Sequence, residues 1–94
     1  MSLVFEWDSE KAEANRKKHR MTFEEALTVF ADPLSLTIQD PDHSTGELRF
    51  ANIGRSAGGH TLVVIHVERG ENIRIISARK ASRQERQTYE EGTG

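Results

Sequence analysis

The sequence predicts an α+β domain, in which a small antiparallel sheet follows two helices and precedes a third. Three observations predict this class. A capping box opens an amphipathic helix in the first third of the chain, three apolar strand patterns follow each other closely in the second half, and another capping box lies near the C-terminus. A length of 94 residues suits one domain, spanning residues 1–94, with a small core.

The first third is predicted to form a short strand, residues 3–7, and two helices. Asp8 can cap a helix that runs to about His19. Thr22 opens the first capping box, and apolar residues follow it at helical spacing, which is typical of a helix with one buried face. Asp32-Pro33 ends this second helix, because the residue before a proline is pushed out of helical geometry.

Four further strands are predicted, three of them joined by tight turns. Residues 34–39 alternate between apolar and polar side chains, as in a half-buried strand. Residues 48–55, 60–67 and 72–79 form the other three, with Gly58-Gly59 in the first turn. The middle one is apolar on both faces, so we expect it at the centre of the sheet. Consecutive strands with short turns predict an antiparallel meander.

The last predicted helix carries the clearest functional signal. Ser82 opens its capping box, and it runs to about Glu91 before Gly92. Tyr89 is almost its only apolar residue, so an apolar stripe alone cannot hold it in place. Positive charge gathers where strand 72–79 meets this helix, although the chain has a net charge of −2. The basic residues of this junction are Arg74, Arg79, Lys80, Arg83 and Arg86.

This junction is a candidate phosphate-binding site. The guanidinium of arginine matches phosphate oxygens in geometry and stays charged at any relevant pH. Arg83 and Arg86 are neighbours on the helix surface, and Tyr89 lies one turn further, where an aromatic ring can stack an unpaired base. The alternative is an ordinary exposed helix whose arginines form salt bridges with its own glutamates.

Arg49 and the histidines complete the set of candidates. Arg49 lies inside a strand, where it needs a partner. That partner is either a carboxylate, such as Glu47 or one on a neighbouring strand, or a functional ligand. His19 can carry a proton, because the unperturbed pKa of histidine is near neutrality. His60 and His66 lie roughly 20 Å apart along one strand and cannot share a metal. His66 is expected in the core, and without cysteine no metal or other cofactor is expected.

Composition narrows the classes of protein further. The absence of cysteine excludes disulfides and fits a cytoplasmic protein. The longest apolar run, Leu62-Val63-Val64-Ile65, is far too short to span a membrane, and the N-terminus lacks a signal-peptide pattern. No P-loop, dinucleotide fingerprint or nucleophile elbow is present.

Residues that match a known family extend from position 4 to position 90. They are Phe5-Glu6-Trp7-Asp8, Lys11, Asn15, Lys18-His19, Phe23-Glu24-Glu25-Ala26, Val29-Phe30, Glu47-Leu48-Arg49-Phe50, Ile53-Gly54-Arg55, Ile73-Arg74-Ile75-Ile76-Ser77-Ala78-Arg79-Lys80-Ala81, Arg83, Glu85 and Tyr89. With these residues the chain resembles the BrnT family of bacterial type II toxins. The most specific part is the combination of the Lys-His helix end with the Ile-Ser-Ala-Arg strand end.

The resemblance implies a RelE-like ribonuclease fold and an endoribonuclease that slows translation by cutting RNA without a metal. It also implies a cognate BrnA-like antitoxin, which would bind DNA so that the pair represses its own operon, and dimerisation within that complex. DNA would be contacted only through the antitoxin. We expect the RNA's own 2′-OH to attack the adjacent phosphate, leaving a cyclic phosphate and a 5′-OH.

Specific roles follow as hypotheses. Arg49 and Arg79 are expected to stabilise the phosphate in the transition state, and His19 to transfer the proton. The expected RNA-binding residues are Lys80, Arg83, Arg86 and Tyr89. The alternative function is a non-catalytic adaptor that binds protein or nucleic acid through its last helix. The lack of an obvious acid–base pair favours that alternative.

Overall fold

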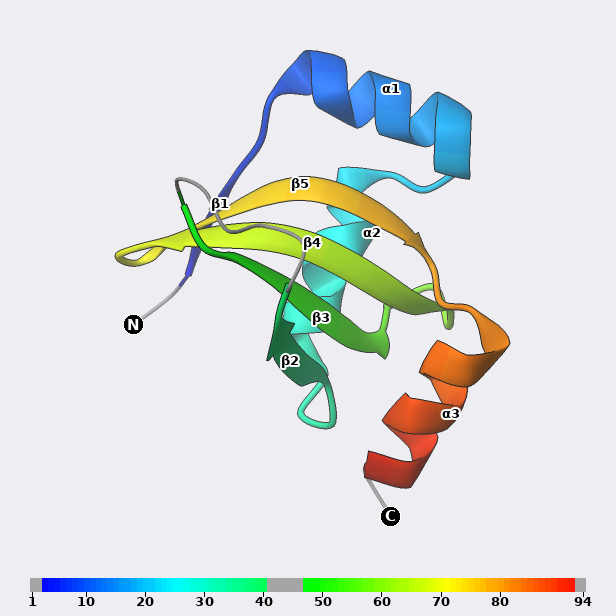
Figure 1. The fold of residues 1–94 in the computed structure, drawn as a ribbon. Coiled ribbons are helices and arrows are strands. Elements are labelled where there is room, and N and C mark those ends of the chain that lie inside the picture. Colours follow the sequence, from blue (N-terminus) through cyan, green and yellow to red (C-terminus); the bar gives the residue numbers. More distant parts are fainter. Residues whose placement is uncertain (1–2, 41–46, 93–94) are drawn as a thin grey trace.

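The computed structural model describes residues 3–40 and 47–92. Within them a twisted sheet is flanked by helices (Figure 1). The elements in chain order are β1 (Val4–Glu6), α1 (Ser9–His19), α2 (Phe23–Leu27), the 3₁₀ helix η1 (Thr28–Ala31), β2 (Leu36–Gln39), β3 (Arg49–Arg55), β4 (Thr61–Arg69), β5 (Asn72–Lys80) and α3 (Arg83–Gly92).

The sheet is mixed, which corrects the prediction of a purely antiparallel meander. Its strand order is β1-β5-β4-β3-β2, and β2 to β5 form the predicted antiparallel meander with β4 at the centre. β1 instead lies parallel to β5, with Phe5 opposite Ile73. The meander leaves one edge of β5 without a neighbouring strand, and β1 satisfies part of that edge.

A buried asparagine satisfies another part of the same edge and fixes α1. The amide of Asn15 donates to the carbonyls of Ala78 and Met21, each at 2.9 Å, and its oxygen accepts from the Ala78 N–H at 3.1 Å. Asn15 therefore replaces a neighbouring strand at Ala78. This contact holds the C-terminal end of α1 beside the end of β5, where the basic junction begins.

Two separate clusters of apolar side chains cover the two faces of the sheet. On the face of α2, Phe23 and Val29 pack with Leu62 and Val64. On the opposite face, Tyr89 of α3 packs with Ile53 and Val63. Successive residues of β4 thus point to opposite faces, as in any strand. Figure 1 shows α2 behind the sheet and α3 at the end where β5 leaves it.

The second helix is shorter than predicted. Thr22 caps it as expected, accepting from the N–H of Glu25 at 3.1 Å. The α-helix ends at Leu27, and the chain continues as a 3₁₀ turn to Ala31. The hydroxyl of Thr28 donates to the Glu25 carbonyl at 2.6 Å, and such local side-chain bonds compete with regular helical bonding. The side chain of Glu25 extends to the β3–β4 turn, where it bonds to Ser56.

Candidate functional site

The β5–α3 junction is held by an ion pair and a complete capping box. Arg79 Nη1 and Nη2 donate to the two carboxylate oxygens of Glu85 at 2.7 and 2.8 Å. The same carboxylate accepts from the N–H of Ser82 at 2.8 Å, and the Ser82 hydroxyl accepts from the N–H of Glu85 at 3.2 Å. The Arg79 guanidinium lowers the pKa of Glu85 to about 2. Polar contacts thus position the start of α3.

Tyr89 holds the far end of α3, and its position corrects the expectation that it stacks a base. Only 6% of the residue is exposed, and its ring packs against Ile53 and Val63. Its hydroxyl donates to Asp32 Oδ2 at 2.7 Å. The ring therefore anchors α3 to the sheet and offers no open face to RNA. A one-turn spacing from Arg86 cannot show this, because it does not fix which side of the helix is covered.

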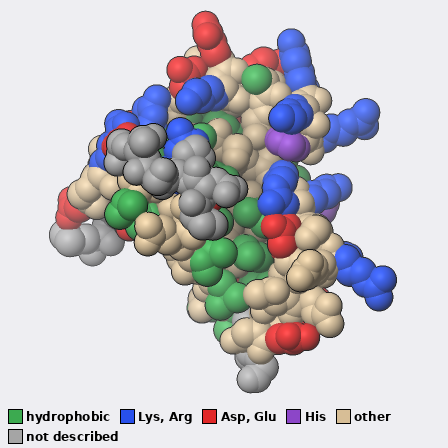
Figure 2. Space-filling model, viewed as in Figure 1, with side chains coloured by type: hydrophobic (Ala, Val, Ile, Leu, Met, Phe, Trp, Pro, Cys, Tyr) green, Lys and Arg blue, Asp and Glu red, His purple; other side chains and the backbone are tan. Residues whose placement is uncertain are grey.

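Basic side chains gather where β3, β5 and α3 meet. A cleft of about 360 Å³ is lined there by Arg55, Lys80 and Arg86, together with His60 and Glu90. A second cleft of about 360 Å³ is lined by Arg83, Arg86, Gln87 and Glu90. We call Arg55, Lys80, Arg83 and Arg86, all of them exposed, the basic edge. Figure 2 shows Lys and Arg side chains along this side of the molecule, from the end of α1 to the start of α3.

The β3–β4 turn brings a histidine and a carboxylate together beside the basic edge. Glu25 Oε2 accepts a hydrogen bond from the Ser56 hydroxyl at 2.6 Å and lies 2.9 Å from His60 Nδ1. The hydrogen bond from Ser56 and then that from His60 lower the pKa of Glu25. Sequence reasoning missed this pair, because its members lie 35 positions apart. The local signal pointed elsewhere, because the spacing makes Glu25 the capping-box partner of Thr22, whereas its side chain bonds to Ser56 and His60.

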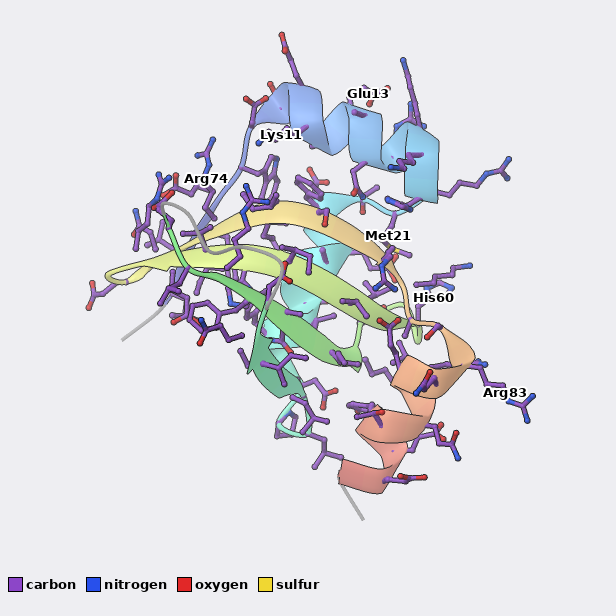
Figure 3. All side chains as sticks on the ribbon, in the orientation of Figure 1. Lys11, Glu13, Met21, His60, Arg74 and Arg83 are labelled. Carbon is purple, nitrogen blue, oxygen red and sulfur yellow. The ribbon has the colours of Figure 1, made fainter. Side chains whose placement is uncertain are left out.

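Arg49 lies at a different site from Arg79. In the sheet Arg49 is opposite Val67 of β4, and Arg79 is opposite Val63 of the same strand. At the usual rise per residue, Val63 and Val67 are roughly 13 Å apart along β4. A cleft of about 280 Å³ around Arg49 is lined by Lys11, Glu47, Val67, Arg69, Arg74 and Ile76. Figure 3 shows Lys11 and Arg74 at the opposite end of the sheet from His60 and Arg83. The structure therefore does not bring the two predicted phosphate-binding arginines together.

The pairs predicted around Arg49 are also rearranged. Glu47 forms its ion pair with Arg69, with both Nε and Nη2 at 2.6 Å from the carboxylate oxygens. Arg74 donates to Glu6 at 2.9 Å. Arg69 and Arg74, which line this cleft around Arg49, are therefore paired with carboxylates.

The remaining histidines differ in their surroundings. His19 is half-buried at the end of α1, as predicted, and no carboxylate among residues 3–40 and 47–92 pairs with it. His66 is fully buried between Phe30 and Phe50, which confirms it as a core histidine. In the described ranges no group of three His, Cys, Asp or Glu side chains is placed to hold a metal ion. None of the helices described is long and apolar enough to cross a membrane.

Comparison with known proteins defines the class. The family model of the ribonuclease toxin BrnT, of type II toxin–antitoxin systems, matches residues 7–85. The chain therefore belongs to the BrnT family of ribonuclease toxins. Its fold is similar to the crystal structure of the Brucella abortus ribonuclease toxin BrnT, with a TM-score of 0.60 and 24% identity, covering 88% of this chain and 99% of that one. A comparison with curated proteins finds no match.

Proposed function

We propose that this toxin is a RelE-like endoribonuclease that binds RNA along the basic edge and cuts it by metal-independent transesterification. The 2′-OH of one nucleotide attacks the adjacent phosphorus, and the bond to the 5′ oxygen of the next nucleotide breaks. The products are a 2′,3′-cyclic phosphate and a 5′-OH. This chemistry needs cations around the phosphate and a group that accepts the 2′ proton.

The observation that carries this proposal is the cleft between β5 and α3. Its lining includes Arg55, Lys80 and Arg86, which are exposed and form no ion pair with the described residues. Exposed arginine and lysine side chains at a concave surface favour phosphate binding. Gathering them there, on a chain of net charge −2, favours a local binding site over a general affinity for nucleic acid.

Arg79 does not line this cleft, and it is proposed to contact the scissile phosphate from the adjoining start of α3, where it pairs with Glu85. A guanidinium has five N–H donors. Glu85 takes two of its hydrogen bonds and the Lys80 carbonyl takes a third, at 3.4 Å. The bidentate pair with Glu85 restrains the group and leaves its other donors available. Arg83 and Arg86 would then bind flanking phosphates.

Arg49 and His19 are kept as separate proposals, because Arg49 lines a different cleft and His19 belongs to α1. Arg49 would stabilise phosphate from its own cleft at the other end of the sheet, and His19 would transfer a proton from the end of α1. Both roles require an RNA that extends across the molecule. Single substitutions of Arg49 and Arg79 should therefore change cleavage independently of each other, in contrast with two arginines that clamp one phosphate.

The partners follow from the family. We propose a BrnA-like antitoxin that covers the toxin in the cytoplasm and carries the DNA-binding activity, so that the complex dimerises on the operator and represses its own operon. An antitoxin that blocks the basic edge would inactivate the toxin by excluding RNA. Co-expression with the neighbouring antitoxin gene should then restore growth, and the complex should not bind labelled RNA.

An RNA cleavage assay in the presence of EDTA tests the proposed reaction. The wild type should leave a cyclic phosphate, and Arg79→Ala should cut roughly 100- to 1,000-fold more slowly, the loss expected for one transition-state donor. Arg16→Ala is a matched control, since Arg16 also forms a bidentate pair, with Glu13, but lies on α1. RNA binding without any cleavage by the wild type would instead identify a non-catalytic adaptor.

A further inference from the structure

The proton acceptor of the reaction has a better candidate than His19. His60 follows the β3–β4 turn and lines the cleft of the basic edge, and 45% of its side chain is exposed. It is exposed enough to meet a substrate, yet one of its ring nitrogens is fixed by a carboxylate. Figure 3 shows His60 near the point where β5 leads into α3, on the side from which Arg83 projects.

A set of contacts holds the carboxylate in place for His60. Glu25 Oε2 accepts from the hydroxyl of buried Ser56 at 2.6 Å and lies 2.9 Å from His60 Nδ1. Ser56 also binds the His60 backbone twice, accepting from its N–H at 3.2 Å and donating its own N–H to the His60 carbonyl at 2.8 Å. Thr28 accepts from the N–H of Ala57 at 2.8 Å. The turn and α2 are therefore joined rigidly.

Gly58 in the β3–β4 turn leaves room for the side chain of Glu25 to approach the turn. A Cβ on Gly58 would lie 2.8 Å from Glu25 Oε2 and 3.1 Å from its Cδ. Such contacts are too close, so any side chain at this position displaces the carboxylate. The glycine is thus required by the position of Glu25 against the turn, and not only by the turn itself.

The carboxylate decides which ring nitrogen of His60 carries the proton. An ionised carboxylate can only accept hydrogen bonds, and the contacts that lower the pKa of Glu25 keep it ionised near neutral pH. His60 Nδ1 must then be the donor. In the neutral imidazole, Nε2 is left as the acceptor, which is the form that a general base requires. The carboxylate also stabilises the imidazolium that forms on accepting a proton.

We propose that His60 is the general base of the ribonuclease reaction, with Glu25 as its positioning residue. This inference rests on the proposed function. His60 Nε2 takes the proton of the 2′-OH as O2′ forms its bond to phosphorus, and the bond from phosphorus to O5′ breaks. The departing O5′ takes a proton from water. The hydroxide so formed is neutralised by the proton on His60 Nε2, so no proton is gained or lost overall.

Charged groups from four elements face His60. The charged groups that face it are Glu25 of α2, Arg55 of β3, Lys80 of β5, and Arg86 and Glu90 of α3. The negative charge of Glu25 is in direct contact and favours the imidazolium. The cations of the basic edge disfavour the imidazolium. They also hold the scissile phosphate next to the 2′-OH that His60 deprotonates. The cleavage rate should rise with pH as His60 loses its proton.

The decisive experiment compares His60→Asn with the wild type in cleavage of an RNA oligonucleotide, from pH 5 to pH 9. The asparagine amide can still donate to Glu25 but cannot accept the 2′ proton. We expect the rate to fall roughly 100- to 10,000-fold, the usual contribution of a general base, and the rise at acid pH to disappear. Binding of the same oligonucleotide with a 2′-deoxy cleavage site should be unchanged. Added imidazole should restore part of the activity of His60→Ala.

A pair of adjacent glutamates provides the matched test of the positioning role. Glu25→Gln removes the acceptor charge that fixes the His60 ring, so kcat should fall roughly tenfold or more while RNA binding stays unchanged. Glu24→Gln makes the same chemical change at an exposed neighbour with no contact to His60, and it should match the wild type. Gly58→Ala should behave like Glu25→Gln, with little loss of thermal stability.

The outcomes separate this inference from the proposed function. If the wild type cleaves RNA and His60→Asn keeps its rate and pH profile, His60 is not the base, although the ribonuclease proposal stands. Loss of the acid rise in His19→Asn but not in His60→Asn would overturn the inference in favour of His19. If the wild type fails to cleave RNA free of its antitoxin, the proposed function itself fails.

Discussion

Removal of the negative charge of Glu85 should destabilise the toxin by loosening the start of α3. The carboxylate accepts two hydrogen bonds from Arg79 and one from the N–H of Ser82. In Glu85→Gln one amide oxygen remains as an acceptor, and the ion pair is lost. The half-buried guanidinium of Arg79 then faces a neutral amide.

The size of this effect follows from the pKa. A fall in the pKa of Glu85 from 4.5 to about 2 is equivalent to roughly 3 kcal/mol of preference for the ionised form in the folded state. The side chain of Arg79 is 42% exposed, so solvent screens the pair and we expect about 1–2 kcal/mol. For a domain of this size that is a fall in Tm of roughly 5–10 °C.

Thermal unfolding followed by circular dichroism from pH 7 to pH 2 measures the effect. Because the pKa of Glu85 is lowered on folding, its stabilisation is complete above about pH 4.5 and is lost as the pH falls towards 2. The wild type should lose Tm over this range more steeply than Glu85→Gln. Glu91→Gln, an exposed position on the same helix, is the control and should follow the wild type. Parallel curves for wild type and Glu85→Gln would refute the reasoning.

Three further predictions test the anchors and the basic edge. Asn15→Ala leaves the backbone of Ala78 without its partners, and urea unfolding should show a loss of roughly 3 kcal/mol; a loss below ~1 kcal/mol would contradict its role at the strand edge. Tyr89→Phe removes the hydrogen bond to Asp32 and should cost about 1–2 kcal/mol by the same measurement, and an unchanged stability would exclude the hydroxyl as an anchor of α3. Arg86→Ala should weaken RNA binding and reduce its dependence on log salt by about 0.7, measured by fluorescence anisotropy, and an unchanged slope would exclude a phosphate contact.

The sequence determined the secondary structure of this toxin well because its signals are local. Asp8 and Ser82 cap the helices where predicted, and the apolar pattern of residues 60–67 located the central strand. A capping residue, a turn glycine and an alternating strand each act through neighbours within a few positions, so they can be read in one dimension. The family was recognisable for the same reason, since its motifs are short segments of strand and helix ends.

The tertiary structure decided how the edges of the elements are used. Nothing in residues 4–6 distinguishes parallel from antiparallel pairing, and β1 lies parallel to β5 because that edge of the sheet was open. The burial of Tyr89 against Ile53 likewise depends on where α3 packs. Its spacing from Arg86 is the same whether the ring faces the sheet or the solvent.

The candidate site shows the same division. The sequence alone located the positive charge at the β5–α3 junction, because Lys80, Arg83 and Arg86 are close neighbours in the chain. Only the fold could bring Glu25 of α2 to within 2.9 Å of His60 Nδ1 at the end of the β3–β4 turn. A proton-transfer group needs a partner fixed in space, and the positions of residues 35 apart in the chain are fixed only by packing.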